Sequence, residues 1–584
     1  MCGIFGYFHR GVRSLSPEKL SAMGMAIQHR GPDDQGIFSA PGLALGNQRL
    51  SIIDLAGGHQ PFFSDDGKIV VVQNGEIFNH VELAADLART GYPCRTHSDT
   101  EVLLRLYERE GISFVSKLNG MFAIAIYDAR EESVYLVRDR IGVKPLYVHD
   151  DGLQLTFGSE IKSLLRAGMP RPAMNEEALH HYLTFNYVPA PLTLYQGVHH
   201  LLPGHVMKIN RAGSSTSRWW DLASVEPVYG RSEANWMEEF NYILDDAVRL
   251  RLRSDVPFGA FLSGGVDSST VVGLMARHMS EPVKTFCIGF DDPLYDESIF
   301  AQEAASRFGT QHIMERVAPD MLELWPMATY HCDQPHGDVS FLPTYRVSAL
   351  AAKHVKVVLT GDGGDELFAG YDKHKNFFSN PDIEKLTDSE FQRRYFNSIS
   401  LFTDHDKSAL YKPDMAARLH GIESFNIAAP YFKAVSHQDR INQALFLDMQ
   451  LLLSGNNLVK PDRMGMAVSL EARTPFLDYR MMEFAFRMPG KLKLKDGVTK
   501  YIYKKAVVPL IGERLAYRKK QMFTVPVGEW FKTTKREYCL SNIPKDFFLN
   551  SELNKICEDH FSSRQNRTRE LRALIALKHW TEML

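Results

Sequence analysis

Residues 256–270, VPFGAFLSGGVDSST, decide the fold of the larger part of the chain. The first seven are an apolar run typical of a buried strand, and the rest are small residues, glycines and an aspartate that lead into a helix. Glycine and serine at such a turn let backbone N–H groups approach an anion, and the helix N-terminus adds positive potential. The stretch lacks the GxxxxGK[ST] pattern of a Walker A loop. We therefore expect a strand, an anion-binding turn and a helix.

Strands and helices alternate around that stretch. Helical periodicity begins at residues 235–253, further strands are expected at 283–290 and 356–361, and helices at 268–279, 297–309 and 343–355. This alternation predicts a parallel sheet with helices on both faces and a ligand at the carboxyl ends of its strands. From about Asp382 onward the pattern is mainly helical.

A second glycine-rich turn, TGDGGDELFAGY (residues 360–371), follows the predicted strand at 356–361. Asp362, Asp365 and Glu366 should therefore lie along the same edge of the sheet as the first turn. Either loop alone could be an ordinary strand-to-helix turn, but two on neighbouring strands indicate a site. Asp267 inside an anion-binding loop is reasonable if Mg²⁺ lies between its carboxylate and a phosphate.

The first two hundred residues have a different pattern. Short apolar runs, such as KIVVVQN (68–74), GMFAIAIYDA (120–129) and SVYLVRDR (133–140), are separated by Gly, Asp and Asn turns. This predicts a hairpin-stacked or sandwich-like domain. We place it at residues 1–212, followed by a linker at 213–235 and the α/β domain at 236–584.

Composition narrows the class of protein. The chain has 584 residues, with 67 Lys and Arg against 70 Asp and Glu and a net charge of −3. This balance argues against a nucleic-acid or membrane-surface partner, and no apolar run approaches the roughly 18 residues that a membrane span needs. The six cysteines have no metal-ligand spacing. We expect a soluble, cytoplasmic protein.

The chain begins MCGIFGYF, which places a cysteine at position 2. Removal of Met1 would leave the Cys2 thiol beside a free α-amine, whose reference pKa of about 8 allows it to accept the thiol proton near neutral pH. The alternative is that a small residue at position 2 only permits methionine removal.

Neighbouring segments favour the catalytic interpretation of Cys2. An amide substrate with an amino-acid head needs an arginine for its carboxylate, acids for its ammonium and donors for the oxyanion. Residues of these kinds occur in NQRLSIIDL, QNGEIFNH and THSDTE: Arg49, Asn74, Gly75, Glu76 and Asp99.

These segments, with HRGPDDQG (29–36), LNGMFAIAIYD (118–128) and RDRIGVKPLY (138–147), resemble the glutaminase domain of the class II, N-terminal-nucleophile (Ntn) glutamine amidotransferases. The resemblance implies an αββα Ntn-hydrolase sandwich in which Cys2 attacks the side-chain amide of glutamine. It implies that Asn74 and Gly75 form the oxyanion hole. The residues implied to hold glutamine are Arg49, Asn74, Glu76 and Asp99.

The second half resembles another group of enzymes. SGGVDSS is similar to the pyrophosphate loop of adenylate-forming ATP pyrophosphatases. With LVKPDRMGMAVSLEARTPFLD (458–478) and YRKKQMFTVPVGEW (517–530), the whole chain resembles the class B, glutamine-hydrolysing asparagine synthetase family. The resemblance implies ATP and Mg²⁺ as cofactors and suggests a homodimer.

Residue roles follow from that resemblance. The pyrophosphate would be held by Ser263, Gly264, Gly265, Ser268 and Ser269, and Mg²⁺ by Asp267 and Asp365. The adenosine would be framed by Leu262, Ile288, Thr360 and Gly361. Lys520, with Lys519 as its neighbour, would stabilise charge during adenylation and amide formation, and Asp362 lies in the catalytic acidic loop.

The implied reaction activates a carboxylate as its adenylate and displaces AMP with ammonia from the Cys2 site. The acceptor is open, because Asp362 stands where the family carries glutamate, and Pro461, Gln334 and His336 also depart from its pattern. Aspartate is the leading acceptor. The alternatives are a sugar uronate of surface polysaccharide, or a carboxylate of a peptide or natural product.

Other classes fit less well. Relatives that close lactam rings without glutamine have no use for an intact Cys2 site, and amidotransferases of phosphoribosyl or hexosamine chemistry lack the SGGVDSS half. A non-catalytic relative would typically have lost Cys2, Asp267 or Asp365, and all three are present.

Overall fold

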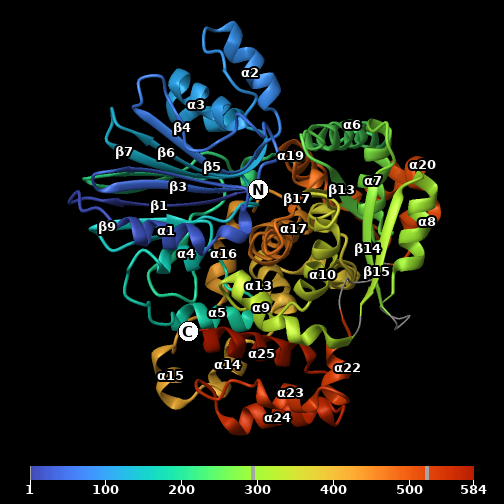
Figure 1. Cartoon of the computed structure of the whole chain (residues 1–584). Coiled ribbons are helices and arrows are strands. Elements are labelled where there is room, and N and C mark those ends of the chain that lie inside the picture. The colour runs from blue at the N-terminus through green and yellow to red at the C-terminus, as the bar shows by residue number, and fades with distance from the viewer. Residues whose placement is uncertain (1, 291–295, 318, 520–524, 584) are drawn as a thin grey trace.

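The computed structural model describes residues 2–290, 296–317, 319–519 and 525–583. An N-terminal sandwich of strands lies on one side of the molecule, and a second sheet lies on the other (Figure 1). Helices of the C-terminal half fill the space between and below them.

The N-terminal part consists of two stacked antiparallel sheets, with strand orders β10-β8-β9-β1-β3-β2 and β12-β11-β7-β6-β5-β4. The first contains β1 (Gly3–His9), β2 (Asp34–Ala40), β3 (Leu43–Arg49), β8 (Tyr147–Asp150), β9 (Gln154–Gly158) and β10 (Val198–His200). The second contains β4 (Phe62–Phe63), β5 (Ile69–Ile77), β6 (Gly120–Asp128), β7 (Ser133–Arg138), β11 (His205–Asn210) and β12 (Gly213–Arg218).

Helices cover the outer faces of this sandwich. Helices α1 (Pro17–Met25) and α4 (Ile161–Leu165) lie on the first sheet, and α2 (His80–Arg89) and α3 (Asp99–Glu110) lie on the second. Buried side chains such as Ile4, Leu45, Val72 and Leu136 fill the space between the sheets. This arrangement confirms the αββα sandwich expected of an Ntn hydrolase.

The expected linker is shorter in the structure. Residues 213–218, which the sequence pattern places in the linker, form strand β12 and pair with β11. Their small polar side chains are mostly exposed at the edge of a sheet, where a polar strand is favourable and resembles a linker in sequence. Helix α6 (Glu233–Arg251) then begins at Glu233.

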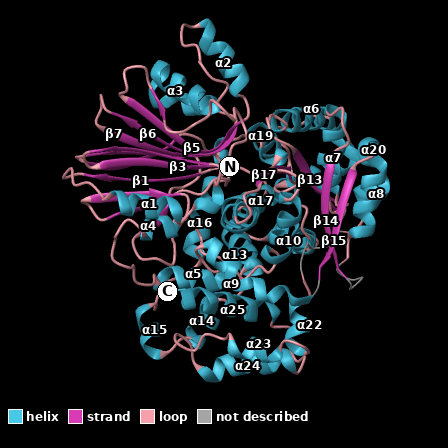
Figure 2. Cartoon of the chain, in the orientation of Figure 1, coloured by secondary structure: helices cyan, strands magenta, loops and turns pink. Residues whose placement is uncertain are grey.

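The C-terminal half is built on a parallel sheet with the order β15-β14-β13-β16-β17 (Figure 2). Its strands are β13 (Phe258–Phe261), β14 (Lys284–Phe290), β15 (Gln311–Val317), β16 (Val357–Leu359) and β17 (Glu471–Arg473). Helices α7 (Val266–His278), α8 (Ser298–Phe308) and α10 (Phe341–Ala352) connect or follow them. Because β13 and β16 are neighbours, the two glycine-rich turns meet at one edge, which confirms the expected parallel α/β fold.

Further helices complete this half. They are α9 (Trp325–Cys332), α11 (Gly364–Phe368), α12 (Asp372–Phe378), α13 (Asp388–Ile399), α14 (Asp404–Leu410), α15 (Pro413–Arg418), α16 (Phe425–Ala434), α17 (Arg440–Asp448), α18 (Val459–Met466), α19 (Tyr479–Arg487), α20 (Tyr501–Ile511), α21 (Glu513–Tyr517), α22 (Val527–Lys532), α23 (Arg536–Ser541), α24 (Asn550–Phe561) and α25 (Thr568–Met583), with the hairpin β18 (Leu494–Lys495) and β19 (Val498–Thr499). Among the described residues, no helix combines the length and the apolar character needed to cross a bilayer.

The two halves share a core. Helix α5 (Glu176–Phe185) precedes residue 212, yet its Leu179 and Tyr182 belong to the same buried cluster as Trp325 and Trp580 of the C-terminal half. The halves are therefore packed tightly enough for side chains of one to position groups in the other.

Candidate functional site

The predicted nucleophile lies at the start of strand β1. Cys2 is buried, with 6% of its surface exposed, and burial raises the pKa of its thiol. Arg49 and Glu76 are close enough to influence that thiol electrostatically. A buried thiol with a raised pKa needs a nearby base to become a nucleophile.

The predicted oxyanion residues lie near the end of β5, in the sheet that faces β1. The Asn74 side-chain amide donates to Ser159 Oγ at 3.2 Å, and the same oxygen accepts the backbone N–H of Ile4 at 3.0 Å. Ser159 thus ties Asn74 to the strand that begins beside Cys2. Sequence reasoning missed Ser159, since no motif marks it.

Gly75 is required by the backbone at this point. Its φ is +149°, and a Cβ atom there would lie 2.0 Å from the carbonyl oxygen of Met121 on the neighbouring strand β6. A side chain is therefore excluded both by the backbone conformation and by the close approach of β6.

The acidic residues predicted to bind the glutamine head group come together as expected. Asp99, the first residue of α3, accepts the Ile77 backbone N–H and the Gln73 side-chain amide, each at 2.9 Å. Burial, with Glu471 and Asp99 nearby, raises the pKa of Glu76 well above its usual range.

Arg473 connects this site to the other half of the chain. It lies on strand β17, 3.7 Å from a Glu76 carboxylate oxygen, and forms a 2.5 Å ion pair with Glu471. Sequence reasoning missed this pair, although its signal was present as two charged residues in a short strand inside the LEARTPFLD segment.

The guanidinium group of Arg49 is held by backbone carbonyls. Its guanidinium donates to the backbone carbonyls of Ile53, Asp54 and Leu55, at 3.2, 2.8 and 3.4 Å. The structure brings Arg49 to the Cys2 site, where it also fixes the loop that follows β3.

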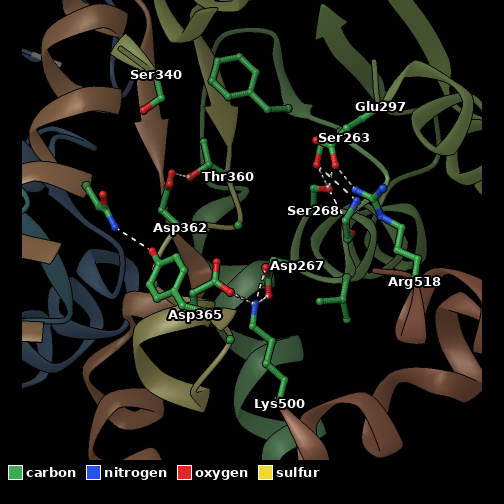
Figure 3. A pocket seen from close by; sticks show the side chains of 18 of the residues that line it. Ser263, Asp267, Ser268, Glu297, Ser340, Thr360, Asp362, Asp365, Lys500 and Arg518 are labelled. Carbon is green, nitrogen blue, oxygen red and sulfur yellow. Dashed lines mark hydrogen bonds and ion pairs between the residues drawn. The ribbon is translucent and has the colours of Figure 1, made fainter. Parts of the chain in front are cut away.

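The second site is a cavity of about 640 Å³ at the carboxyl ends of β13, β14 and β16 (Figure 3). Most of the predicted ATP and metal residues line it, together with the predicted catalytic residue Asp362: Leu262, Ser263, Gly265, Asp267, Ser268, Ile288, Thr360, Gly361 and Asp365. Two do not line the cavity. Gly264 makes the turn with φ +71° against the backbone of Phe300, and Ser269 is fully buried in the first turn of α7.

The two predicted metal ligands converge on one cation. Lys500 Nζ lies 2.6 Å from Asp267 Oδ2 and 2.8 Å from Asp365 Oδ1 (Figure 3). Burial lowers the pKa of Lys500, but the two carboxylates more than offset this and raise it overall. Sequence reasoning missed Lys500, because it lies in a loop far downstream of both aspartates.

These two carboxylates fit Mg²⁺. Proteins typically hold Mg²⁺ with one or two carboxylates, and substrate phosphates and water complete its coordination. Within the described ranges, no group of three or more His, Cys, Asp or Glu side chains is arranged to hold a metal by itself. An Mg²⁺ ion at Asp267 and Asp365 would therefore depend on a phosphate ligand.

The pyrophosphate turn is internally ordered. Ser263 Oγ lies 3.2 Å from Ser268 Oγ and accepts the Gly265 backbone N–H at 3.3 Å. Arg518, which also lines the cavity, is paired with Glu297. Lys519 lines the cavity as well, whereas the predicted Lys520 lies outside the described residues.

The opposite end of the cavity carries an acid and two cations that sequence reasoning did not assign. Lys460 of α18 donates to Ser340 Oγ at 3.0 Å, and Arg572 comes from α25. Neither makes an ion pair with a carboxylate in the described part of the chain. Together they outweigh the effect of burial and hold the pKa of half-buried Asp338 at about 2. Thr360 donates to Asp362 at 2.7 Å, and burial raises the pKa of Asp362.

Of the three further departures from the family pattern, only one reaches this cavity. Pro461 lines it, but Gln334 accepts the Leu194 backbone N–H at 3.0 Å and His336 faces Asn456, and neither contributes to its wall. Gln334 and His336 therefore do not contact a ligand in the cavity directly.

Comparison with known proteins agrees with both sites. Residues 239–582 match the family described as Asparagine synthase, and residues 1–220 match the Glutamine amidotransferase domain. Asparagine synthetase [glutamine-hydrolyzing] 1 of Bacillus subtilis is 34% identical over 99% of this chain and 96% of that protein. Asparagine synthetase [glutamine-hydrolyzing] 3 of the same organism is 29% identical over 92% of this chain and 90% of that protein. Amidase chyE of Penicillium rubens is 28% identical over 91% of this chain and 89% of that protein.

Each of the two matched domains contains one of the sites described above, and the first relative aligns with nearly the whole chain. The chain belongs to the asparagine synthase family and carries the glutamine amidotransferase domain of that family at its N-terminus.

Proposed function

We propose that this chain is a glutamine-hydrolysing asparagine synthetase, which amidates aspartate at the expense of ATP and releases AMP and diphosphate. The observation that carries the proposal is the presence, in one packed chain, of a buried Cys2 site beside Asn74 and a separate cavity formed by the two glycine-rich turns. The names of the relatives point to the same activity.

In the first half-reaction, Cys2 supplies the nucleophile. After removal of Met1, the α-amine of Cys2 accepts the thiol proton, and the thiolate attacks the side-chain carbonyl carbon of glutamine. The Asn74 amide and the Gly75 backbone N–H stabilise the resulting oxyanion, and ammonia leaves. Water then hydrolyses the glutamyl thioester to glutamate and restores the thiol.

In the second half-reaction, the aspartate side-chain carboxylate attacks the α-phosphorus of ATP, and the bond to diphosphate breaks. Backbone N–H groups of the turn at 263–268 hold the departing diphosphate. Asp267 and Asp365 would hold Mg²⁺, which supplies charge neutralisation at the phosphates when it is bound.

The amide bond forms when ammonia displaces AMP. The nitrogen lone pair attacks the acyl carbon of the adenylate, the bond to AMP breaks, and a proton must leave the nitrogen. Asp362 lies at this edge of the cavity, and its raised pKa suits it to accept that proton.

The acceptor end of the cavity has the charges that aspartate needs. Arg572 and Lys460, which lack carboxylate partners in the described chain, can bind the α-carboxylate, and Asp338 can bind the ammonium group. Ser340 lies on this side of the cavity, across from Ser263 and Arg518 at the pyrophosphate turn (Figure 3). The arrangement therefore supports an amino-acid acceptor over a sugar uronate, which has no ammonium group.

Ammonia must cross from one site to the other without being protonated. A buried apolar cluster lies at the boundary of the two halves, with Leu50, Ile52 and Met121 from the first and Val357 and Met466 from the second. A passage through this cluster would be apolar, which would disfavour the charged ammonium ion and favour transfer of neutral ammonia.

The proposal is tested by product analysis. Purified protein with glutamine, ATP and Mg²⁺ should release diphosphate only when aspartate is added, with matching asparagine by mass spectrometry. Cys2→Ala should work with ammonia but not with glutamine, while Cys94→Ala, a matched cysteine that is not at the site, should retain both. Hydrolysis of glutamine without aspartate-dependent diphosphate would contradict aspartate as the acceptor.

The family resemblance also leads us to propose a cytoplasmic homodimer. Light scattering coupled to size-exclusion chromatography tests the dimer: a mass of twice 66.3 kDa is expected, and 66.3 kDa would refute it.

A further inference from the structure

A buried ion-pair network crosses the boundary between the two halves. Its centre is Arg30, fully buried, whose guanidinium donates to Asp462 through two nitrogens at 2.9 and 3.0 Å and to Glu160 at 2.9 Å. Arg30 and Glu160 belong to the N-terminal sandwich, while Asp462 lies on helix α18 of the C-terminal half.

Further charges extend the network on both sides. Arg463, next to Asp462, lies 2.9 Å from Glu160 and 3.4 Å from Asp333. Lys162 of α4 lies 2.8 Å from Asp333. Burial opposes ionisation of Asp462 and Glu160, but the neighbouring cations lower both pKa values below their usual range, so both remain charged.

One end of the network holds the glutaminase residues. Arg30 Nε donates to the backbone carbonyl of Cys2 at 3.2 Å. Glu160 directly follows Ser159, which binds both the Ile4 backbone and the Asn74 amide. The backbone of Cys2 therefore contacts the buried ion pairs through one hydrogen bond from Arg30, and Asn74 is joined to them through Ser159, the residue before Glu160.

The other end reaches the wall of the synthetase cavity. Helix α18 begins with Val459, and its next two residues, Lys460 and Pro461, line the cavity immediately before Asp462. Asp333 likewise begins the segment that leads to Asp338 and Ser340 at the acceptor end. A shift of α18 on ligand binding would thus be transmitted to Arg30 through Asp462.

We propose that Asp462 is a positioning residue for glutamine hydrolysis: through Arg30 it holds Cys2 in place, and through α18 it makes that placement depend on the state of the acceptor end of the cavity. The dependence on the acceptor rests on the proposed function. The positioning of Cys2 does not, because it concerns glutamine hydrolysis alone.

Stability by itself is a weak reason for such a network. Replacing buried ion pairs by well-packed apolar residues is often neutral or stabilising, because the charges must be taken out of water. An ion pair instead fixes the position of the two charged side chains relative to each other. A bidentate arginine–carboxylate pair also fixes their relative orientation, because its two hydrogen bonds lie in one plane. Displacement of a reacting group by about 1 Å can lower a rate by about a hundredfold.

The first experiment compares Asp462→Asn with the wild-type chain. Release of glutamate from glutamine should fall by about tenfold to a hundredfold in kcat/KM, while ammonia-dependent formation of diphosphate stays at the wild-type level. Stimulation of glutamate release by ATP and aspartate should be lost. Unchanged glutamate release, or an equal loss of both activities, would overturn the proposal.

The matched control is Asn119→Ala. Asn119 also makes a buried hydrogen bond across the boundary, to Asp478 at 2.9 Å, but no hydrogen bond or ion pair of its side chain joins it to Arg30 or Cys2. Its glutamate release should remain high. A loss equal to that of Asp462→Asn would show that any weakening of the boundary suffices, and would overturn a specific role for Asp462.

A double variant separates positioning from folding if Asp462→Asn is unstable. Arg30→Met combined with Asp462→Leu removes the two charges that pair with each other, so the thermal midpoint should rise above that of Asp462→Asn, even though buried Lys144, 3.6 Å from Asp462, loses its carboxylate. Glutamate release should nevertheless stay low, because the Cys2 carbonyl has lost its donor. Recovery of glutamate release together with the midpoint would refute the proposal. Absence of asparagine synthesis in the wild-type chain would instead refute the proposed function, and glutamate release would still test the positioning.

Discussion

Gly75→Ala is the substitution for which the structure gives the clearest expected effect. The new Cβ would lie 2.0 Å from the Met121 carbonyl oxygen and 2.6 Å from Phe122 Cα, both of which are backbone atoms in the adjacent strand. Ordinary contact needs about 3.4 Å or more, so β5 and β6 must separate by roughly an ångström at Asn74 and Gly75.

The expected loss follows from that displacement. A shift of about 1 Å in groups that stabilise a transition state costs about a hundredfold in rate, which corresponds to about 2.7 kcal/mol in the activation barrier. The positive φ of Gly75 adds backbone strain of about 1–3 kcal/mol, which acts on stability. The synthetase cavity does not include this strand, so ammonia-dependent synthesis should be retained.

The assay measures glutamine-dependent and ammonia-dependent asparagine formation on the same preparation. Gly91→Ala is the matched control, because Gly91 also has a positive φ, +90°, but a Cβ there meets nothing within 4 Å. The control should keep its glutamine-dependent activity. If Gly75→Ala also keeps it, the oxyanion role assigned to this turn is refuted.

Three further substitutions test other parts of the structure. Lys493 is fully buried, and burial lowers the pKa of its ammonium group from 10.5 to about 7. The unfolded state therefore binds more protons between pH 7 and 10.5, and the free energy of unfolding should rise with pH across that window. Lys493→Met should remove this pH dependence and add up to about 4 kcal/mol of stability at pH 7, and an unaltered pH dependence in denaturant titrations would contradict this. Arg572→Ala should raise the KM for aspartate by about tenfold to a hundredfold and leave the KM for ATP unchanged, whereas a rise only for ATP would place Arg572 at the nucleotide. Lys500→Met should lower the free energy of unfolding by about 3 kcal/mol, because it leaves Asp267 and Asp365 without their shared cation. Added Mg²⁺ should restore part of the lost thermal midpoint. A midpoint that does not respond to Mg²⁺ would contradict a metal site at these two carboxylates.

The sequence was sufficient for the architecture because the relevant signals are local. Alternating apolar strands and helices predicted the parallel sheet, and short apolar runs with turns predicted the sandwich. Strand β12 was mistaken for a linker because its exposed position at a sheet edge leaves it polar. Strand β17 has three residues and follows a long helical stretch, so its pairing with β16 depends on tertiary contacts.

Site residues carried by glycine-rich motifs were also predictable, since those motifs fix backbone shape over a few residues. Lys500, Arg572 and Arg473 were not, because each reaches its site through packing alone, from a distant loop, helix and strand respectively. Ser269 was assigned to the pyrophosphate turn by its place in the motif, but the first turn of α7 buries it. Motif spacing identifies the loop, whereas the helix period decides which of its side chains face the ligand.

The most direct test of the account follows nitrogen from one site to the other. The chain is incubated with glutamine labelled with ¹⁵N at the side-chain amide, aspartate, ATP, Mg²⁺ and an excess of unlabelled ammonium, and asparagine is examined by mass spectrometry. The account predicts that asparagine carries a larger ¹⁵N fraction than the free ammonium, and that labelled and unlabelled asparagine together match AMP and diphosphate. Cys2→Ala should give no labelled product. Glutamate and free ¹⁵N-ammonia without labelled asparagine would contradict it.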